Sequence, residues 1–258
     1  MRGARLLLAL IVPACGAGPT RTSLSYADRA REAYERAMED FENDNCVEAE
    51  PAFREVRREF PYSRYAALAE LRIADCLLAQ GKHDEAIAAY RRFTRSRPSH
   101  PEVPYARFRV AEAHFQRIPD EWLLSPPAYE RDQGPTRDAL QQLRRFLEDY
   151  PEDERAGQAR RMERRCLELL ARHELYVARF YLDRDRPLAA IGRLRTALRA
   201  YEGSGVEAEA LLLLGRTYLH LRDRHQARRA FEELVTRFPR SGYAAQARAY
   251  LDEMGRAG

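Results

Sequence analysis

Residues 74–98 read ADCLLAQGKHDEAIAAYRRFTRSRP, and this stretch decides the fold. It places small residues at Ala74 and Ala86, a bulky ring at Tyr90 and a proline at Pro98, at intervals of twelve, four and eight residues. Alanine lets two helix backbones approach to about 8–9 Å, and the tyrosine one turn later fills the space beside them. Because proline lacks an N–H and clashes with a continuing helix, it ends the second helix. The stretch therefore predicts a pair of packed helices.

The same intervals recur along the chain. They are met by Ala37, Ala49, Phe53 and Pro61, by Gly215, Ala227, Phe231 and Pro239, by Ala178, Ala190, Leu194 and Glu202 without the proline, and by Ala111, Ala139, Leu143 and Pro151 with sixteen extra residues in the first interval. A single helix pair cannot bury its apolar face, so neighbours must stack. The pattern resembles the tetratricopeptide repeat over roughly residues 26–252. It predicts an all-α, right-handed superhelical solenoid of about five helix hairpins with a concave groove, closed by a capping helix over 243–255.

Two segments interrupt the repeat. Residues 118–135 (IPDEWLLSPPAYERDQGP) contain four prolines and the single tryptophan, Trp122. This density of breakers excludes a helix and predicts a loop, either a tolerated surface insertion or a binding loop. Residues 152–173 predict an extra charged helix that runs into the next hairpin as one rod. The expected organisation is repeats 1–3 over 26–151, the connecting helix over 152–173, and repeats 4–5 with the capping helix over 174–255.

Turns inside the first two hairpins carry residues that accept a positive φ. Gly81 follows the first helix of the second hairpin, and Asn45 follows that of the first. Glycine has no Cβ to clash in the left-handed region, and asparagine tolerates it. We expect both residues to have positive φ.

The first fifteen residues differ from the rest of the chain. Arg2 and Arg5 precede LLLALIV, an apolar run at 6–12. Seven residues span only about 10 Å as a helix, so this is a signal segment and not a membrane span. The run Val12-Pro13-Ala14-Cys15 resembles a bacterial lipobox, in which the cysteine is acylated and becomes the mature N-terminus.

We therefore expect a signal peptide over 1–14 and a lipidated N-terminus with a short linker over 15–25. Buried lipid chains contribute about 0.8 kcal/mol per CH₂, so a multiply acylated Cys15 would hold the protein on the membrane. The alternative is an ordinary secretory peptide with an incidental Cys15. Gly16 follows the cysteine, and by resemblance to lipoprotein sorting rules this favours the outer membrane.

Three further cysteines lie at Cys46, Cys76 and Cys166. No two of them have metal-ligand spacing, and an odd number cannot all pair in an oxidising compartment. We expect all three cysteines to be free thiols that are packed in the core or have no chemical role. A Cys46–Cys76 bridge is the alternative.

No catalytic or metal-binding constellation is visible in the sequence. His220 and His225 are five residues apart, which misses the i, i+4 spacing of helical zinc ligands. Asp183 and Asp185 fall in a turn, where acidic residues are common. The 44 Lys and Arg and 40 Asp and Glu are interleaved, without the basic block of a nucleic-acid binder. We expect no enzyme, no cofactor, no metal and no nucleic acid.

Several runs go beyond a generic repeat. They are Phe60-Pro61-Tyr62-Ser63, Arg97-Pro98-Ser99-His100-Pro101 before a helix with Tyr105, the third-unit insertion ending in Arg131-Asp132, and LARHELYVARFY at 170–181. With the lipobox, they resemble the BamD family, lipoproteins of the β-barrel assembly machinery of Gram-negative bacteria. The resemblance spans nearly the whole mature chain.

The resemblance implies a lipid-anchored protein on the periplasmic face of the outer membrane, in a complex with other lipoproteins. It implies that the N-terminal repeats engage signals on unfolded outer-membrane β-barrel substrates. It also implies that the C-terminal repeats dock the periplasmic domains of the barrel-forming subunit. A periplasmic repeat scaffold that coordinates envelope constriction or peptidoglycan enzymes is the alternative. Proteins of that kind often carry an N-terminal coiled coil, whereas here only residues 16–25 separate the anchor from the first helix. A repeat-bearing hydrolase would need catalytic residues that are not visible.

The repeat register itself selects candidate groove residues on the first helix of each N-terminal hairpin. They are Tyr34, Met38, Phe41, Leu71, Asp75, Leu78, Tyr105, Phe108, Glu112 and Phe115. Such an aromatic, apolar channel with two carboxylates suits an extended peptide with aromatic side chains. The alternative is that several of them form the core between repeats.

A second set comprises candidates for partner docking: Trp122, Arg193, Arg195 and Arg199. Forked guanidinium groups could meet carboxylates of a partner. The alternative for each arginine is an ordinary solvated position.

Overall fold

The computed structural model describes residues 24–119 and 125–256, and its regular structure in those ranges is entirely helical. The elements are α1 (Tyr26–Glu42), α2 (Cys46–Glu59), α3 (Arg64–Ala79), α4 (His83–Ser96), α5 (Val103–Gln116), the 3₁₀ turn η1 (Ala128–Glu130), α6 (Gly134–Asp149), α7 (Ala156–Leu182), α8 (Pro187–Ala200), α9 (Glu207–His220), α10 (Arg224–Arg237) and α11 (Gly242–Arg256). None of these helices is long and apolar enough to cross a membrane.

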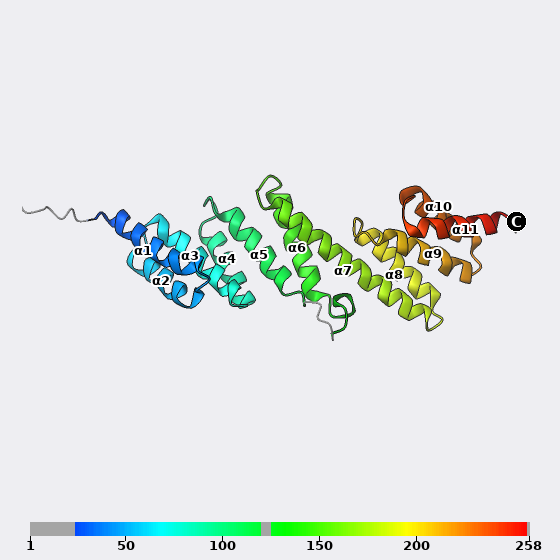
Figure 1. Ribbon diagram of the computed structural model, residues 1–258, viewed down its shortest axis with the longest axis horizontal. Coiled ribbons are helices and arrows are strands. Elements are labelled where there is room, and N and C mark those ends of the chain that lie inside the picture. The colour runs from blue at the N-terminus through cyan, green and yellow to red at the C-terminus, as the bar shows by residue number, and fades with distance from the viewer. Residues whose placement is uncertain (1–23, 120–124, 257–258) are drawn as a thin grey trace, which may run out of the picture.

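The helices form an elongated stack that runs from α1 at one end to α11 at the other (Figure 1). Each helix packs on the next, which gives the hairpins α1–α2, α3–α4, α5–α6, α7–α8 and α9–α10, while α11 packs on α10 and α9. The predicted all-α solenoid of helix hairpins with a final helix is confirmed.

The small residues of the repeat lie where helices touch. The repeat alanines at 37, 49, 74, 86, 111, 139, 178, 190 and 227 are at most 1% exposed, and so are the fillers Phe53, Tyr90, Leu143, Leu194 and Phe231. Gly215 makes the closest approach, because a Cβ built there would stand 2.3 Å from Cε1 of Phe231. The twelve- and four-residue intervals therefore describe a packing relationship inside each hairpin.

Prolines end most of the second helices. Helices α2, α4, α6 and α10 end two residues before Pro61, Pro98, Pro151 and Pro239. Proline removes the N–H that a further helical turn would use and disfavours a helical residue before it. The eight-residue interval between the bulky filler residue and the proline therefore sets where the second helix of the hairpin ends.

The fourth hairpin ends without a proline. Helix α8 stops two residues before Glu202, and the chain then turns through Gly203 and Gly205, with φ of 82° and 84°. The buried carboxylate of Glu207 accepts hydrogen bonds from the N–H groups of Gly203 (2.6 Å) and Ser204 (3.0 Å). Two glycines and a buried acceptor thus replace the proline.

Turns within four hairpins share one register. The residue seven positions after the small residue of the first helix has a positive φ at Asp44 (57°), Gly81 (73°), Asp185 (53°) and Arg222 (58°). The prediction is confirmed for Gly81 and wrong by one residue for Asn45, which instead precedes α2 with φ of −89°. Asn45 lies eight residues after Ala37, whereas the left-handed residue follows the seven-residue register even where it is aspartate or arginine.

The two segments that interrupt the repeat, 118–135 and 152–173, differ in structure. The described part of the insertion contains the turn η1, and its last two residues, Gly134 and Pro135, already belong to the first turn of α6. Trp122 lies outside the described residues. The expected charged helix and the first helix of the fourth hairpin are one continuous helix, α7, of 27 residues. The segment at 152–155 is a turn ahead of that helix.

Two of the cysteines are paired. A disulfide joins Cys46 at the start of α2 to Cys76 in α3, with Cα atoms 5.2 Å apart. The expectation of idle thiols is therefore wrong for this pair, because stacking brings the second helix of one hairpin against the first helix of the next. Cys166 is free and buried, and burial raises the pKa of its thiol to about 12. It is the packed, unreactive thiol expected.

Candidate functional site

The ten predicted groove residues divide by burial. Tyr34, Met38, Phe41, Tyr105, Glu112 and Phe115 are partly exposed, whereas Leu71, Asp75, Leu78 and Phe108 are buried. Helix α3 packs against α1, α2 and α4, so nearly all of its middle and end is covered. For the four buried residues the core role is the one this structure shows. The six others retain surface that a ligand could contact.

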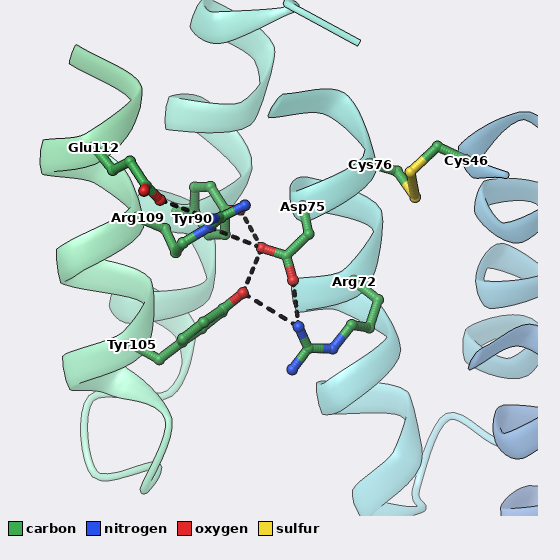
Figure 2. A network of polar contacts seen from close by, with 8 residues as sticks. All are labelled: Cys46, Arg72, Asp75, Cys76, Tyr90, Tyr105, Arg109 and Glu112. Carbon is green, nitrogen blue, oxygen red and sulfur yellow. Dashed lines mark hydrogen bonds and ion pairs between the residues drawn. A yellow bond between two sulfur atoms is a disulfide. The ribbon is translucent and has the colours of Figure 1, made fainter. Parts of the chain in front are cut away.

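Asp75 is the centre of a buried polar network (Figure 2). Its carboxylate is 1% exposed and accepts hydrogen bonds from the hydroxyls of Tyr105 (2.7 Å) and Tyr90. It also pairs with Nη1 of Arg72 at 2.5 Å and with Nε of Arg109 at 3.1 Å. A buried charge is tolerated only when it is paired and hydrogen-bonded, and this one has four donors.

The protonation states in the network follow from its geometry. Burial, and next the charge of Asp75, raise the pKa of both Tyr90 and Tyr105 above its ordinary value. Burial opposes the charge on Arg72 and Arg109, but their acidic and phenolic neighbours raise the pKa of each guanidinium overall. At neutral pH the tyrosines are therefore neutral donors and the arginines are cations.

The network extends to α7. Nη1 of Arg109 pairs with Glu112 at 2.6 Å, and Glu112 accepts a 3.3 Å hydrogen bond from Gln158 of α7. Glu112, predicted as a groove carboxylate, is thus held between two helices and keeps part of its surface exposed.

Tyr105 is surrounded by cations. The guanidinium carbons of Arg155, Arg72 and Arg109 lie 5.1, 5.3 and 5.9 Å from its ring centroid. Arg72 also lies 5.6 Å from the ring centroid of Phe41 on α1. Guanidinium groups at this distance from a ring are attracted by its quadrupole.

Aromatic rings continue from this cluster onto α1. The ring centroid of Tyr34 lies 5.4 Å from that of Tyr65 on α3 and 5.6 Å from that of Phe53 on α2. We call the partly exposed residues Tyr34, Met38, Phe41, Tyr65, Arg72 and Tyr105 the aromatic–arginine face. Rings beside partly exposed guanidinium groups can hold an aromatic side chain and a carboxylate of one ligand.

Sequence reasoning missed Tyr90, Arg72 and Arg109 as partners of Asp75. The signal was available, because a carboxylate in the apolar run LRIADCLL (71–78) needs buried donors. Arg72 stands three residues before Asp75 within this run, whereas Tyr90 lies on α4 and Arg109 on α5, so the register alone could not pair these two with Asp75.

The three predicted docking arginines of α8 are exposed. Arg193 pairs with Glu174 of α7 at 3.3 Å, and Arg195 donates a 2.7 Å hydrogen bond to the hydroxyl of Tyr218. Arg195 and Arg199 line a cleft of about 540 Å³ between α8 and α10, together with Arg229 and Arg237. We call this the arginine cleft.

Charge in the arginine cleft is only partly balanced. Glu202 and Glu233 both pair with Arg237, at 3.0 and 2.7 Å. Arg199 and Arg229 form no ion pair with any described residue. The four arginines and two glutamates of the lining leave a net positive charge, which favours an anionic partner.

Cys15 and Trp122 lie outside the described residues. Within the described ranges, no group of three or more His, Cys, Asp and Glu side chains is arranged to hold a metal.

Fold and site together define a helical-repeat protein of the tetratricopeptide type, with an aromatic–arginine face and an arginine cleft. The family described as "YfiO: Outer membrane lipoprotein" matches residues 26–228. The chain therefore belongs to the YfiO family of outer membrane lipoproteins, and it is a non-enzymatic member.

Relatives extend this match over most of the chain. The outer membrane protein assembly factor BamD of Caulobacter vibrioides is 30% identical over 98% of this chain and 80% of its own length. BamD of Xylella fastidiosa strain 9a5c is 28% identical over 80% of this chain and 71% of its own length, and BamD of Neisseria gonorrhoeae is 27% identical over 83% and 81%. The TPR2AB domain of yeast Sti1, solved in complex with pHSP90, covers 89% of this chain and 87% of its own at 10% identity and a TM-score of 0.46.

Proposed function

We propose that this lipoprotein aids the assembly of outer-membrane β-barrel proteins by holding two kinds of partner at opposite ends of one solenoid. Its aromatic–arginine face binds signals on unfolded β-barrel substrates, and its arginine cleft docks an acidic surface of the barrel-forming subunit. Its relatives over most of the chain are named outer membrane protein assembly factors. The observation that carries the proposal is the Asp75-centred cluster beside partly exposed aromatic rings.

The aromatic–arginine face suits an extended segment rich in aromatic side chains. The guanidinium of Arg72 lies beside the rings of both Phe41 and Tyr105, so a ligand ring can pack against either of these two rings next to a cation. Because Asp75 fixes Arg72 and Arg109, their conformations are set before the ligand arrives. Pre-set side chains reduce the entropy lost on binding.

The arginine cleft suits a folded partner with surface carboxylates. Arg199 and Arg229 lie on neighbouring second helices, and neither has to break an internal ion pair to meet a carboxylate. Forked, bidentate arginine–carboxylate contacts are directional and set the register of an interface. The partner in this proposal is the periplasmic part of the barrel-forming subunit, and other lipoproteins of the complex join the same assembly.

The anchor completes the proposal. Acylation of Cys15 would hold the solenoid on the periplasmic face of the outer membrane, close to both partners. A Cys15→Ala variant is expected to leave the membrane fraction. Its retention there would contradict the anchor.

Binding of a substrate peptide tests the main claim. A labelled peptide with alternating aromatic residues and a free carboxylate is titrated into wild-type protein and into a Phe41→Ala, Tyr105→Phe double variant. We expect at least tenfold weaker binding by the variant. Tyr62→Ala is the matched control, because Tyr62 is 94% exposed between α2 and α3, outside the face. Equal affinities for all three proteins would contradict the proposal.

A further inference from the structure

The disulfide lies at the joint between the first two hairpins. Cys46 is the first residue of α2, and Cys76 lies in α3, thirty residues further along the chain. Both half-cystines are buried, Cys76 completely. This bridge is the one disulfide among the described residues, and it links the second helix of one hairpin to the first helix of the next (Figure 2).

The first hairpin has described neighbours on one side only. Helix α1 packs on α2 and α3, and α2 packs on α1 and α3. In a linear stack each hairpin is stabilised by its neighbours, so a hairpin at the end of the stack opens before the middle ones. Without a cross-link, the joint between α2 and α3 is the place where such opening would occur.

The aromatic–arginine face crosses this joint. Tyr34 and Phe41 come from α1, whereas their ring and guanidinium partners Tyr65 and Arg72 come from α3. Cys76 directly follows Asp75, the centre of the network. Separation of the first hairpin would therefore divide the face and leave Arg72 with the α3 and α5 part alone.

We propose that the Cys46–Cys76 disulfide is a positioning staple that keeps the first hairpin docked on the second and so keeps the aromatic–arginine face assembled. The role of this face in peptide binding rests on the function proposed above. Closing a loop of thirty residues restricts the opened state, so loss of the bridge should raise the opening equilibrium of the first hairpin about a hundredfold.

Hydrogen exchange tests the staple without any ligand. The full-length protein is compared with a Cys46→Ala, Cys76→Ala variant and with Cys166→Ala, which removes a buried thiol far from the joint. In the double variant we expect amide protection across α1 and α2 to fall about tenfold, with α8–α11 unchanged, because protection falls no further once the hairpin is mostly open. In Cys166→Ala we expect α1 and α2 to exchange as in wild type. Unchanged protection in α1 and α2 of the double variant, or an equal loss along the whole chain, would overturn the proposal.

Reduction of the wild-type protein separates the cross-link from the packing of the two side chains. Dithiothreitol is oxidised to its cyclic disulfide while Cys46 and Cys76 each become a thiol, so no side-chain carbon is lost. Because the bridge is buried, reduction is carried out in a low concentration of urea that is then removed. The reduced protein should show the same local loss of protection as the double variant. Full protection of α1 and α2 in the reduced protein would show that the bridge is not a staple.

Peptide binding then separates this inference from the proposed function. We expect the oxidised protein to bind the aromatic peptide and the double variant to bind it about tenfold more weakly, because only molecules with a docked first hairpin carry the assembled face, although every residue of the face is intact. Equal binding by both would overturn the positioning role. If the oxidised wild-type protein itself does not bind the peptide, the proposed function fails, while the exchange data still decide whether the bridge holds the hairpin.

Discussion

Phe231 of α10 occupies the space in which residue 215 of α9 would carry a Cβ: the built atom would stand 2.3 Å from the ring. The ring is fully buried and also stacks on Tyr250 of α11 at a centroid distance of 5.0 Å. It therefore cannot move aside without disturbing the last hairpin and the final helix together.

Gly215→Ala should destabilise the protein. Moving Phe231 or the backbone costs about 1–3 kcal/mol, as in other overpacked cores. Gly192→Ala is the matched control, because Gly192 lies inside α8 with no atom within 4 Å of a built Cβ. There alanine should stabilise by up to about 1 kcal/mol through helix propensity. Urea unfolding of both variants measures the difference, and equal effects would contradict the close approach.

Asp75→Asn should cost about 3 kcal/mol, because it leaves Arg72 and Arg109 near an uncharged amide while keeping the shape of the side chain. Both arginines retain some exposed surface, which limits the loss. Glu55→Gln breaks the exposed pair with Arg58 and should cost less than about 1 kcal/mol. Denaturant midpoints distinguish the two. A cost for Asp75→Asn as small as that for Glu55→Gln would show that the network does not stabilise the stack.

Stability should fall in alkaline solution through the buried tyrosines. Burial, and next Asp75, raise the pKa of Tyr90 above its unfolded value of about 10, so the folded state holds this proton more tightly. The contribution is full below about pH 10 and is lost as the pH rises further, at up to about 1.4 kcal/mol per pH unit for each proton. Unfolding free energies between pH 9 and 11 should decline less steeply in Tyr90→Phe than in wild type. The same slope in both proteins would contradict the assignment.

Glu207→Ala should weaken the turn after α8. Its carboxylate accepts two backbone hydrogen bonds where other hairpins have a proline, and unsatisfied buried N–H groups cost about 1–3 kcal/mol. Glu232→Ala, an exposed change on α10, should alter stability by less than about 0.5 kcal/mol. Thermal unfolding measures both. Indistinguishable midpoints would mean that the glycines alone make the turn.

Arg199→Glu with Arg229→Glu should reduce co-purification of the barrel-forming subunit at least tenfold, because the cleft would repel carboxylates. Arg164→Glu, on the exposed side of α7, changes a charge elsewhere and should have little effect. Quantified pull-down from gently solubilised membranes checks this. Unchanged recovery with the cleft variant would place the docking surface elsewhere.

The hairpins could be predicted because their determinants lie within one unit. Ala74, Ala86 and Tyr90 are linked by contacts between two helices that follow each other directly, so their spacing is visible in the sequence. Even the turns obey this local register, which makes the error at Asn45 one of a single residue.

Contacts between units were less predictable. Cys46 and Cys76 meet only because α2 packs on α3, and two of the four donors to Asp75, Tyr105 and Arg109, lie on α5 of the next hairpin. The register placed Leu71 and Leu78 on the groove side, yet packing on three neighbouring helices buries them. Which side chains of a repeat remain exposed depends on how closely neighbouring hairpins stack. The residue spacings within one hairpin do not determine that distance.

Site-specific photo-crosslinking in living cells tests the central claim most directly. A photo-crosslinking amino acid replaces Phe41 of the aromatic–arginine face in one strain and the exposed Tyr62 in another. We expect irradiation during synthesis of outer-membrane β-barrel proteins to yield covalent adducts with these substrates at position 41 and few at position 62. Adducts of equal yield at both positions, or none at position 41 while β-barrel proteins are being assembled, would contradict it.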